Sequence, residues 1–288
     1  MKARLLPLLV FASLISSSIT AQSGTGVPDL GRRPVLEALA KAYPDSIVLN
    51  TGDEAVTVNG KEFVWAEGRL LPPELAARWA DYAPQPFYPY PRDVPDIASW
   101  SDDKVADAEA RLAQRRNNAP RRSSGFFDAL WGISSESEAD DHQQSVRFLG
   151  FKVTVHRALI GPLSRVEARL NAGRTVDPTL DAFLNGLAQL DGYNWRDIAE
   201  TRSRSNHSYG AAIDIIPKAF GGRIPYWLWA RQDKPGWYRA AWANRWQPHP
   251  AVIAAFEAEG FLWGGKWLLF DTIHFEYRPE ILILNGMR

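Results

Sequence analysis

Two short segments of the sequence carry side chains that can hold a metal ion. Residues 205–214 contain His207 and Asp214, and residues 271–276 contain His274. A catalytic zinc ion typically takes three protein ligands and keeps its fourth position for water. Two imidazoles and one carboxylate meet that count and leave enough Lewis acidity to lower the pKa of a water ligand. We therefore expect these three side chains to bind one zinc ion per chain.

The composition limits which other side chains could hold a metal. The chain has no cysteine and five histidines, which excludes a disulfide framework, a thiolate nucleophile and a cysteine zinc site. Asp214 lies between Ile213 and Ile215, where an unpaired carboxylate would be costly. A bound cation would explain why this acid is tolerated, and Gly210 would let the chain turn tightly between the first two ligands.

A second acid, Asp271, stands three residues before His274. Side chains three residues apart in an ideal strand point to opposite faces, so we expect Asp271 on the bend that leads into the strand. From there it would act as general base toward the attacking water and then as general acid toward the departing amine. Glu276 shares the strand face of His274. It is a candidate for orienting that ligand imidazole or, alternatively, for a surface ion pair.

Together the two segments resemble the motifs of peptidase family M15, the zinc D-Ala-D-Ala carboxypeptidases and L-alanyl-D-glutamate peptidases. The pattern S-x-H-x-x-G-x-A-x-D is met by Ser205, His207, Gly210, Ala212 and Asp214. An Asp-x-x-His-Phe-Glu segment, similar to that of phage and cell-wall endopeptidases, is met by Asp271, His274, Phe275 and Glu276. The run Trp-Gly-Gly-Lys-Trp at residues 263–267 also resembles that branch.

The resemblance covers about residues 146–288 and implies a fold and a set of roles. The fold would be the α+β one that Hedgehog signalling domains share with D,D-peptidases, a small antiparallel sheet flanked by helices. In it His207, Asp214 and His274 would bind zinc, and Asp271 would be catalytic.

The family also uses an upstream arginine to polarise the scissile carbonyl and stabilise its oxyanion. We assign this role to Arg196, whose setting at residues 192–196 resembles a glycine–aromatic–arginine segment. Arg202 and Arg204 lie nearer the first motif and stay alternatives. Ser205 is expected to hydrogen-bond near the metal or to the substrate's carboxylate, or else to satisfy the backbone of a turn.

Other residues have less specific roles. Eight of the twelve tryptophans lie from Trp195 onward, where they could form platforms for a glycan or peptide strand, or pack the core. We expect the remaining histidines to be structural or surface residues: His142, His156 and His249.

The periodicity of the sequence predicts the elements that must position the site. In the first half we expect a hairpin around the Asn59-Gly60 turn, an extended surface connector in the proline-rich residues 84–95, a charged helix ending at Arg116, and loops at residues 117–124 and 134–141. In the second half we expect strands at residues 149–155, 195–199, 211–216 and 273–277, and helices at residues 178–190 and 250–259. Because helices and strands do not alternate regularly, an α+β fold is favoured over a doubly wound sheet.

The expected organisation is a signal peptide at residues 1–21, an N-terminal extension at residues 22–145 and a zinc peptidase domain at residues 146–288.

The N-terminus has the order of a secretory leader. Lys2 and Arg4 precede an apolar stretch at residues 5–15, and small polar residues follow up to Ala21. The apolar stretch is too short to span a bilayer comfortably, so we expect an exported, periplasmic or extracellular protein without a membrane span.

The overall charge bears on partners. Lys+Arg and Asp+Glu both number 33, so no global positive field would hold a nucleic acid.

We expect a secreted zinc peptidase that hydrolyses an amide bond in peptidoglycan stem peptides, either as a D-Ala-D-Ala carboxypeptidase or as an L-Ala-D-Glu type endopeptidase. The alternatives are a zinc-containing wall-binding or signalling module without turnover, and a secreted general peptidase. The bond cleaved and the oligomeric state stay open.

Overall fold

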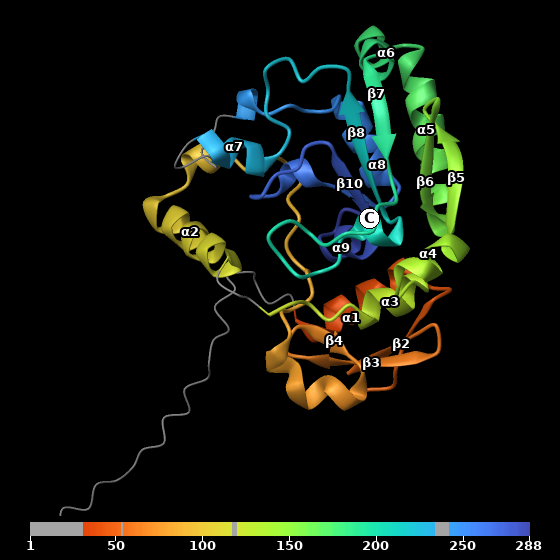
Figure 1. Cartoon of the computed structure of the whole chain (residues 1–288), viewed down its shortest axis with the longest axis vertical. Coiled ribbons are helices and arrows are strands. Elements are labelled where there is room, and N and C mark those ends of the chain that lie inside the picture. The colour runs from red at the N-terminus through yellow and green to blue at the C-terminus, as the bar shows by residue number, and fades with distance from the viewer. Residues whose placement is uncertain (1–30, 53, 117–119, 234–241) are drawn as a thin grey trace, which may run out of the picture.

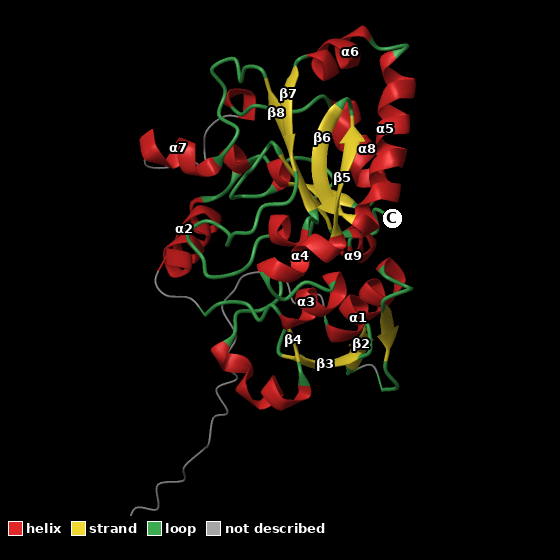
Figure 2. Ribbon diagram, turned by 45° about the vertical axis from the view of Figure 1, so that its right-hand side comes forward, coloured by secondary structure: helices red, strands yellow, loops and turns green. Residues whose placement is uncertain are grey.

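The computed structural model describes residues 31–52, 54–116, 120–233 and 242–288 (Figure 1). The expected signal peptide, residues 1–21, lies outside these ranges. Among the described helices, none is both long and apolar enough to cross a bilayer. Figures 1 and 2 show the sheet β1–β4 at one end of the molecule, α5 along one side, and α2 and α7 on the opposite side.

The N-terminal extension begins with a helix and a four-stranded antiparallel sheet. These elements are α1 (Arg32–Ala42), β1 (Ile47–Leu49), β2 (Ala55–Val58), β3 (Lys61–Ala66) and β4 (Arg69–Leu71), with sheet order β1-β2-β3-β4. The predicted hairpin is β2–β3, and its turn places Asn59 at φ 47° and Gly60 at φ 82°. Both central residues of a type I′ turn need such positive φ values, which is why Asn-Gly is favoured there.

The proline-rich residues 84–95 contain no helix or strand, and they do not simply lie on the surface as expected. Phe87 and Tyr90 are buried in the main core. The Tyr90 hydroxyl donates to Glu257 Oε1 at 2.6 Å and accepts from the Trp263 backbone N–H at 2.8 Å. Because these aromatic side chains find partners in the second half of the chain, the connector is fixed to it.

Three helices follow: α2 (Asp102–Arg116), α3 (Gly125–Trp131) and α4 (Glu136–His142). The expected loop at residues 134–141 was therefore wrong. Glu136 and Glu138 lie in the first turn of α4, where negative charge stabilises a helix. The Ser134 hydroxyl and backbone N–H both donate to Glu138, at 2.7 and 2.8 Å, and these bonds fix that end. Of the other expected loop, residues 117–119 lie outside the described ranges.

The second half of the chain supplies the sheet that holds the site. Its elements are β5 (Gln143–Phe148), β6 (Phe151–His156), α5 (Ile160–Arg174), α6 (Pro178–Asn185), β7 (Leu187–Asp191), β8 (Ala212–Pro217), α7 (Trp227–Asp233), α8 (Pro250–Ala258), β9 (Phe261–Trp263), β10 (His274–Tyr277) and α9 (Pro279–Leu284). The central sheet has the order β7-β8-β10-β9 and is antiparallel throughout, while β5 and β6 form a separate hairpin. Helices mixed with small antiparallel sheets make an α+β fold, as predicted.

Three further predictions differ from the structure. The helix from residue 178 starts at its Asp177 cap but ends at Asn185, because Leu187 and Leu190 are buried in β7, which pairs with β8. Residues 149–155 were expected to form one strand, but Leu149 lies in the turn between β5 and β6. Residues 195–199, all within the described ranges, form no strand.

Most of the buried apolar residues form one cluster that includes side chains of α1, the extension sheet, the connector and the central sheet. A second, smaller cluster contains Ile97, Val105, Trp227, Ala230 and Phe270. We call it the satellite cluster, and it joins α2 to α7. The molecule thus has a main body, built around the larger cluster, and a separate side packed around the satellite cluster.

Candidate metal centre

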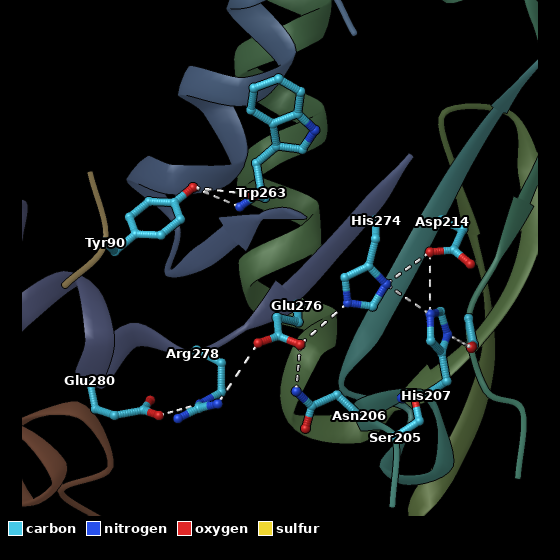
Figure 3. A network of polar contacts seen from close by, with 11 residues as sticks. Tyr90, Ser205, Asn206, His207, Asp214, Trp263, His274, Glu276, Arg278 and Glu280 are labelled. Atoms are coloured by element: carbon cyan, nitrogen blue, oxygen red, sulfur yellow. Dashed lines mark hydrogen bonds and ion pairs between the residues drawn. The ribbon is translucent and has the colours of Figure 1, made fainter. Parts of the chain in front are cut away.

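The register of the central sheet places two of the expected ligands side by side. Asp214 on β8 is the pairing partner of His274 on β10. Residues directly opposite each other in an antiparallel pair project to the same face, so their side chains can meet. The Asp214 Oδ1 and His274 Nδ1 atoms lie 3.0 Å apart (Figure 3).

His207 reaches the same point from a short 3₁₀ helix, Asn206–Tyr209, just before β8. Ser205 caps this helix, because its Oγ accepts from the His207 backbone N–H at 3.3 Å. The structure thus shows the turn role considered for Ser205. Gly210 follows at φ 64°, and a Cβ there would collide with the Gln143 Oε1 atom. Position 210, between the first two ligands, therefore accepts only glycine.

The tautomers of both imidazoles suit a cation. His207 Nδ1 lies 2.5 Å from the Gly192 carbonyl oxygen, which can only accept, so Nε2 offers its lone pair. His274 Nε2 faces the Glu276 carboxylate at 3.3 Å and leaves Nδ1 toward Asp214. Hydrogen bonds of this kind on the far ring nitrogen are typical of metal-binding histidines.

The spacing of the donor atoms also fits a zinc ion. His207 Nε2 lies 3.1 Å from His274 Nδ1 and 3.3 Å from Asp214 Oδ1. With bonds of about 2.0–2.1 Å, the ligands of a tetrahedral site lie roughly 3.3–3.4 Å apart. In the described part of the chain, these three residues form a group whose ligand atoms all lie within 4.8 Å of one another. The residues present therefore fit the cation that the sequence predicts.

Burial and mutual contact shift the pKa values of Asp214 and His274. Burial by itself would raise the pKa of Asp214, but the His207 and His274 imidazoles outweigh it and hold that pKa well below its usual range. Burial lowers the pKa of His274, yet the hydrogen bonds that its imidazole donates to the Asp214 and Glu276 carboxylates raise it to about 10. A cation that binds here must therefore displace a proton.

Glu276 lies against the ligand His274 instead of forming a surface ion pair. Its Oε2 atom also accepts from the Asn206 side-chain amide at 2.7 Å. Its other oxygen faces Arg278 Nη1 at 3.8 Å, and Arg278 is only 2% exposed and donates to the buried Glu280 (Figure 3). A chain of buried charges thus runs from the ligand toward α9.

Asp271 lies on the bend before β10, where its carbonyl accepts from the His274 backbone N–H at 3.2 Å. Burial raises the pKa of Asp271 to about 7; the charge of Asp214 adds to this, while His274 and Arg196 oppose it. Its Oδ1 atom is buried and has no hydrogen-bond partner among the described residues. A carboxyl group with such a pKa suits proton transfer near neutral pH.

The three candidate arginines differ in what they contact. Arg196 is exposed, and its charge acts on Asp271. Arg204 donates to Asp128 at 2.5 Å and lies over the Trp195 ring at 4.4 Å, so its guanidinium is already engaged. Arg202 is exposed on the same loop. Of the three, Arg196 is the one with an electrostatic contact to the acid.

Some contributors to the site carry no signal in the sequence. The Gly192 carbonyl is a backbone atom, and Arg278 at the end of a strand has the character of a surface residue. Asn206 stands directly before His207 in the motif, at a position where the pattern allows any residue. Of these three contributors, only Asn206 could have been found from its position in the sequence motif.

Two family models match the chain. One, described as D-alanyl-D-alanine carboxypeptidase, matches residues 199–277, which include the three metal-binding candidates, Asp271 and Glu276 but not Arg196. At the level of the family, this match supports a peptidase similar to D-alanyl-D-alanine carboxypeptidases. The match over these residues supports membership of peptidase family M15. The other model, a domain of unknown function, matches residues 35–87. No solved structure matches the chain.

Proposed function

We propose that this protein is an exported, zinc-dependent peptidase that hydrolyses an amide bond in peptidoglycan stem peptides. The observation that carries the proposal is the approach of His207, Asp214 and His274 to one point beside the buried carboxyl group of Asp271, whose Oδ1 has no partner among the described residues. The description of the matching family supports a peptide substrate of the bacterial wall. Export rests on the leader-like residues 1–21, and the division at residue 146 stays a prediction.

The side chains of this protein supply the proton transfers and charge stabilisation of amide hydrolysis. When bound, zinc acts as a Lewis acid and lowers the pKa of a water ligand. Asp271 takes a proton from the attacking water and delivers it to the nitrogen of the departing amine. A C–O bond forms, the C–N bond breaks, and a carboxylate and an amine result. The Arg196 guanidinium stabilises the negative charge that develops on the carbonyl oxygen.

Two substitutions test this proposal. Asp271→Ala should keep stoichiometric zinc and lose hydrolysis of purified muropeptides by a factor of about 10²–10⁴, the usual contribution of a general base. His207→Ala should lose both metal and activity. Metal analysis and mass spectrometry of the digested muropeptides measure the two effects. Full activity in either variant would overturn the mechanism.

A further inference from the structure

The cleft above the metal centre is much larger than a small peptide requires. Its volume is about 1810 Å³, and Asp214, Asp271 and His274 all line it. Pockets that enclose a drug-sized ligand typically measure roughly 300–1000 Å³. A terminal dipeptide is smaller than such a ligand, so most of the cleft lies beyond what a dipeptide would fill.

One side of the cleft comes from the N-terminal extension, and we call it the extension side. Trp65 and Glu67 line it from the end of β3 and the following turn, and Tyr88 lines it from the connector. The Trp65 ring stacks on Phe87 with ring centres 6.2 Å apart, and Tyr90 anchors the connector to the main body. These residues therefore form a fixed surface.

A second part of the lining adjoins the satellite cluster, and we call it the tryptophan side. Trp100, next to α2, and Trp229 on α7 both line the cleft there. Trp229 is 50% exposed, and Lys104 lies over the Trp100 ring at 4.4 Å. Half-exposed indole rings beside a catalytic centre offer large, rigid contact areas to a ligand.

The metal-binding residues lie between these two sides. In the view of Figure 1, β10 lies above β4 and below and to the right of α7. The backbone of Asp271 pairs with that of Tyr226, which directly precedes α7. The loop between β7 and β8 adds the exposed Arg196 and Arg202 to the lining. A ligand that followed the cleft would thus pass over the reacting centre and continue beyond it, with the Arg202 cation available for its carboxylates.

We infer that the cleft binds a peptide strand that continues past the scissile amide in both directions, with the extension side and the tryptophan side as its two walls. The inference rests on the proposed function and narrows it. The substrate is an internal amide of a branched or cross-linked acidic wall peptide, and removal of a free terminal residue is not the main reaction. The part of the chain that matches a domain of unknown function thereby acquires a role in substrate binding.

Binding to an inactive form tests the inference without relying on turnover. Full-length, zinc-loaded Asp271→Ala is titrated calorimetrically with the D-Ala-D-Ala dipeptide, a muropeptide monomer and a cross-linked muropeptide dimer. We expect the Kd of the dimer to be at least tenfold lower than that of the dipeptide. Equal Kd values for the dipeptide and the dimer would overturn the inference.

Substitutions in the same background test each side. Trp229→Ala should raise the Kd of the dimer at least fivefold and leave that of the dipeptide unchanged. Trp79→Ala is the matched control, because Trp79 is 39% exposed and lies outside the cleft lining. A Trp229→Ala variant that matches the control, or that weakens both ligands equally, would exclude the tryptophan side.

For the extension side, Trp65→Ala should also weaken the dimer selectively. Since Trp65 packs on Phe87, the exposed Glu67→Arg is a second variant that leaves this packing intact. This variant should change the Kd of the dimer at least threefold. An unchanged Kd would exclude the extension side from ligand binding. Absence of hydrolysis by the zinc-loaded wild-type protein would refute the proposed function, whereas the Kd series would still decide the inference about the cleft.

Discussion

At the scale of single residues, the candidate metal centre includes side chains other than its three expected ligands. Glu276 is held between Asn206 and Arg278 and in turn faces His274 Nε2. Removing one partner from a buried group of charges leaves the others uncompensated. The orientation of the ligand imidazole is therefore a property of this group.

Glu276→Gln should weaken zinc binding by a factor of about 10–100, the usual effect of losing the partner of a metal-binding histidine. The amide keeps the volume but loses the charge that faces His274 Nε2. Competition with a chelator of known affinity measures the change. The exposed Glu74→Gln is the control and should bind zinc as the wild type does. Unchanged affinity in Glu276→Gln would remove Glu276 from the site.

Zinc binding should release protons and weaken as the pH falls. The pKa of His274 is raised to about 10 in the metal-free protein, so its imidazole is protonated at neutral pH and must lose that proton to coordinate. Calorimetry at about pH 7.5 in buffers of different ionisation enthalpy measures the protons released. We expect about one proton per zinc ion. A value near zero would contradict the assignment of His274 as a ligand.

Asp271→Asn should stabilise the metal-free protein at pH 8 more than at pH 4. The folded-state pKa of about 7 lies above the ordinary value of 3.8, so the folded state holds its proton longer than the unfolded state does. Stability is therefore lost as the pH rises from 3.8 through 7, and the neutral amide avoids this loss. Thermal unfolding at both pH values measures the difference. An equal change at the two pH values would argue against a buried acid.

At the scale of elements, the turn between the first two ligands sets the geometry of the site. Gly210 combines a left-handed backbone with a close approach to Gln143 and to the His156 backbone nitrogen. Gly221 has a similar φ of 60°, but among the described residues no atom lies within 4 Å of the point that a Cβ would occupy. A Cβ at position 221 would introduce backbone strain alone, whereas a Cβ at position 210 would add a steric clash.

Gly221→Ala should cost about 1–2 kcal/mol, the penalty of the left-handed conformation alone. Gly210→Ala should cost more and should also lose zinc, because the turn cannot bring His207 and Asp214 together around the new methyl group. Thermal unfolding and metal analysis of both variants check this expectation. Similar stability and metal content in the two variants would show that the close approach at Gly210 is unimportant.

The sequence predicts elements well where the signal is local. Strands β8 and β10 and helix α8 lie within a residue or two of their expected bounds, and the β2–β3 hairpin turns where Asn-Gly predicts. Helix α5 was missed although Leu163, Val166 and Leu170 have helical spacing, because Gly161 and Pro162 obscure its start. The end of α6 depends on pairing between β7 and β8, which no local pattern contains.

The same distinction applies to the candidate site. His207, Asp214 and His274 were found because their chemistry is unusual and their spacing is local to two motifs. The Gly192 carbonyl and the Arg278 side chain contribute through contacts between distant parts of the chain. Such contacts exist only once the fold has formed.

At the scale of the whole molecule, the extension and the peptidase part share one hydrophobic core. Helix α1 packs against α9, and the Tyr43 hydroxyl donates to the buried Glu280 at 2.8 Å. Phe87 and Tyr90 of the connector are buried in the same core. Separating the two parts would expose this apolar surface to water.

A fragment of residues 143–288 should therefore fail to unfold cooperatively, whereas the full chain should show a single transition. Circular dichroism during heating measures both. The transition of the full chain provides the reference for the fragment. A fragment with a sharp transition near that of the full chain would establish an independently folding domain and contradict this expectation.

Because of the satellite cluster, the turnover number and the metal content of the protein can change independently of each other. The three candidate zinc ligands come from the main body, whereas Asp271 follows Phe270 of the satellite cluster and pairs with Tyr226 beside Trp227. The distance between Asp271 and the candidate ligands thus depends on the few apolar side chains of the satellite cluster. Changes among those side chains would alter the turnover number while leaving a fully metallated protein.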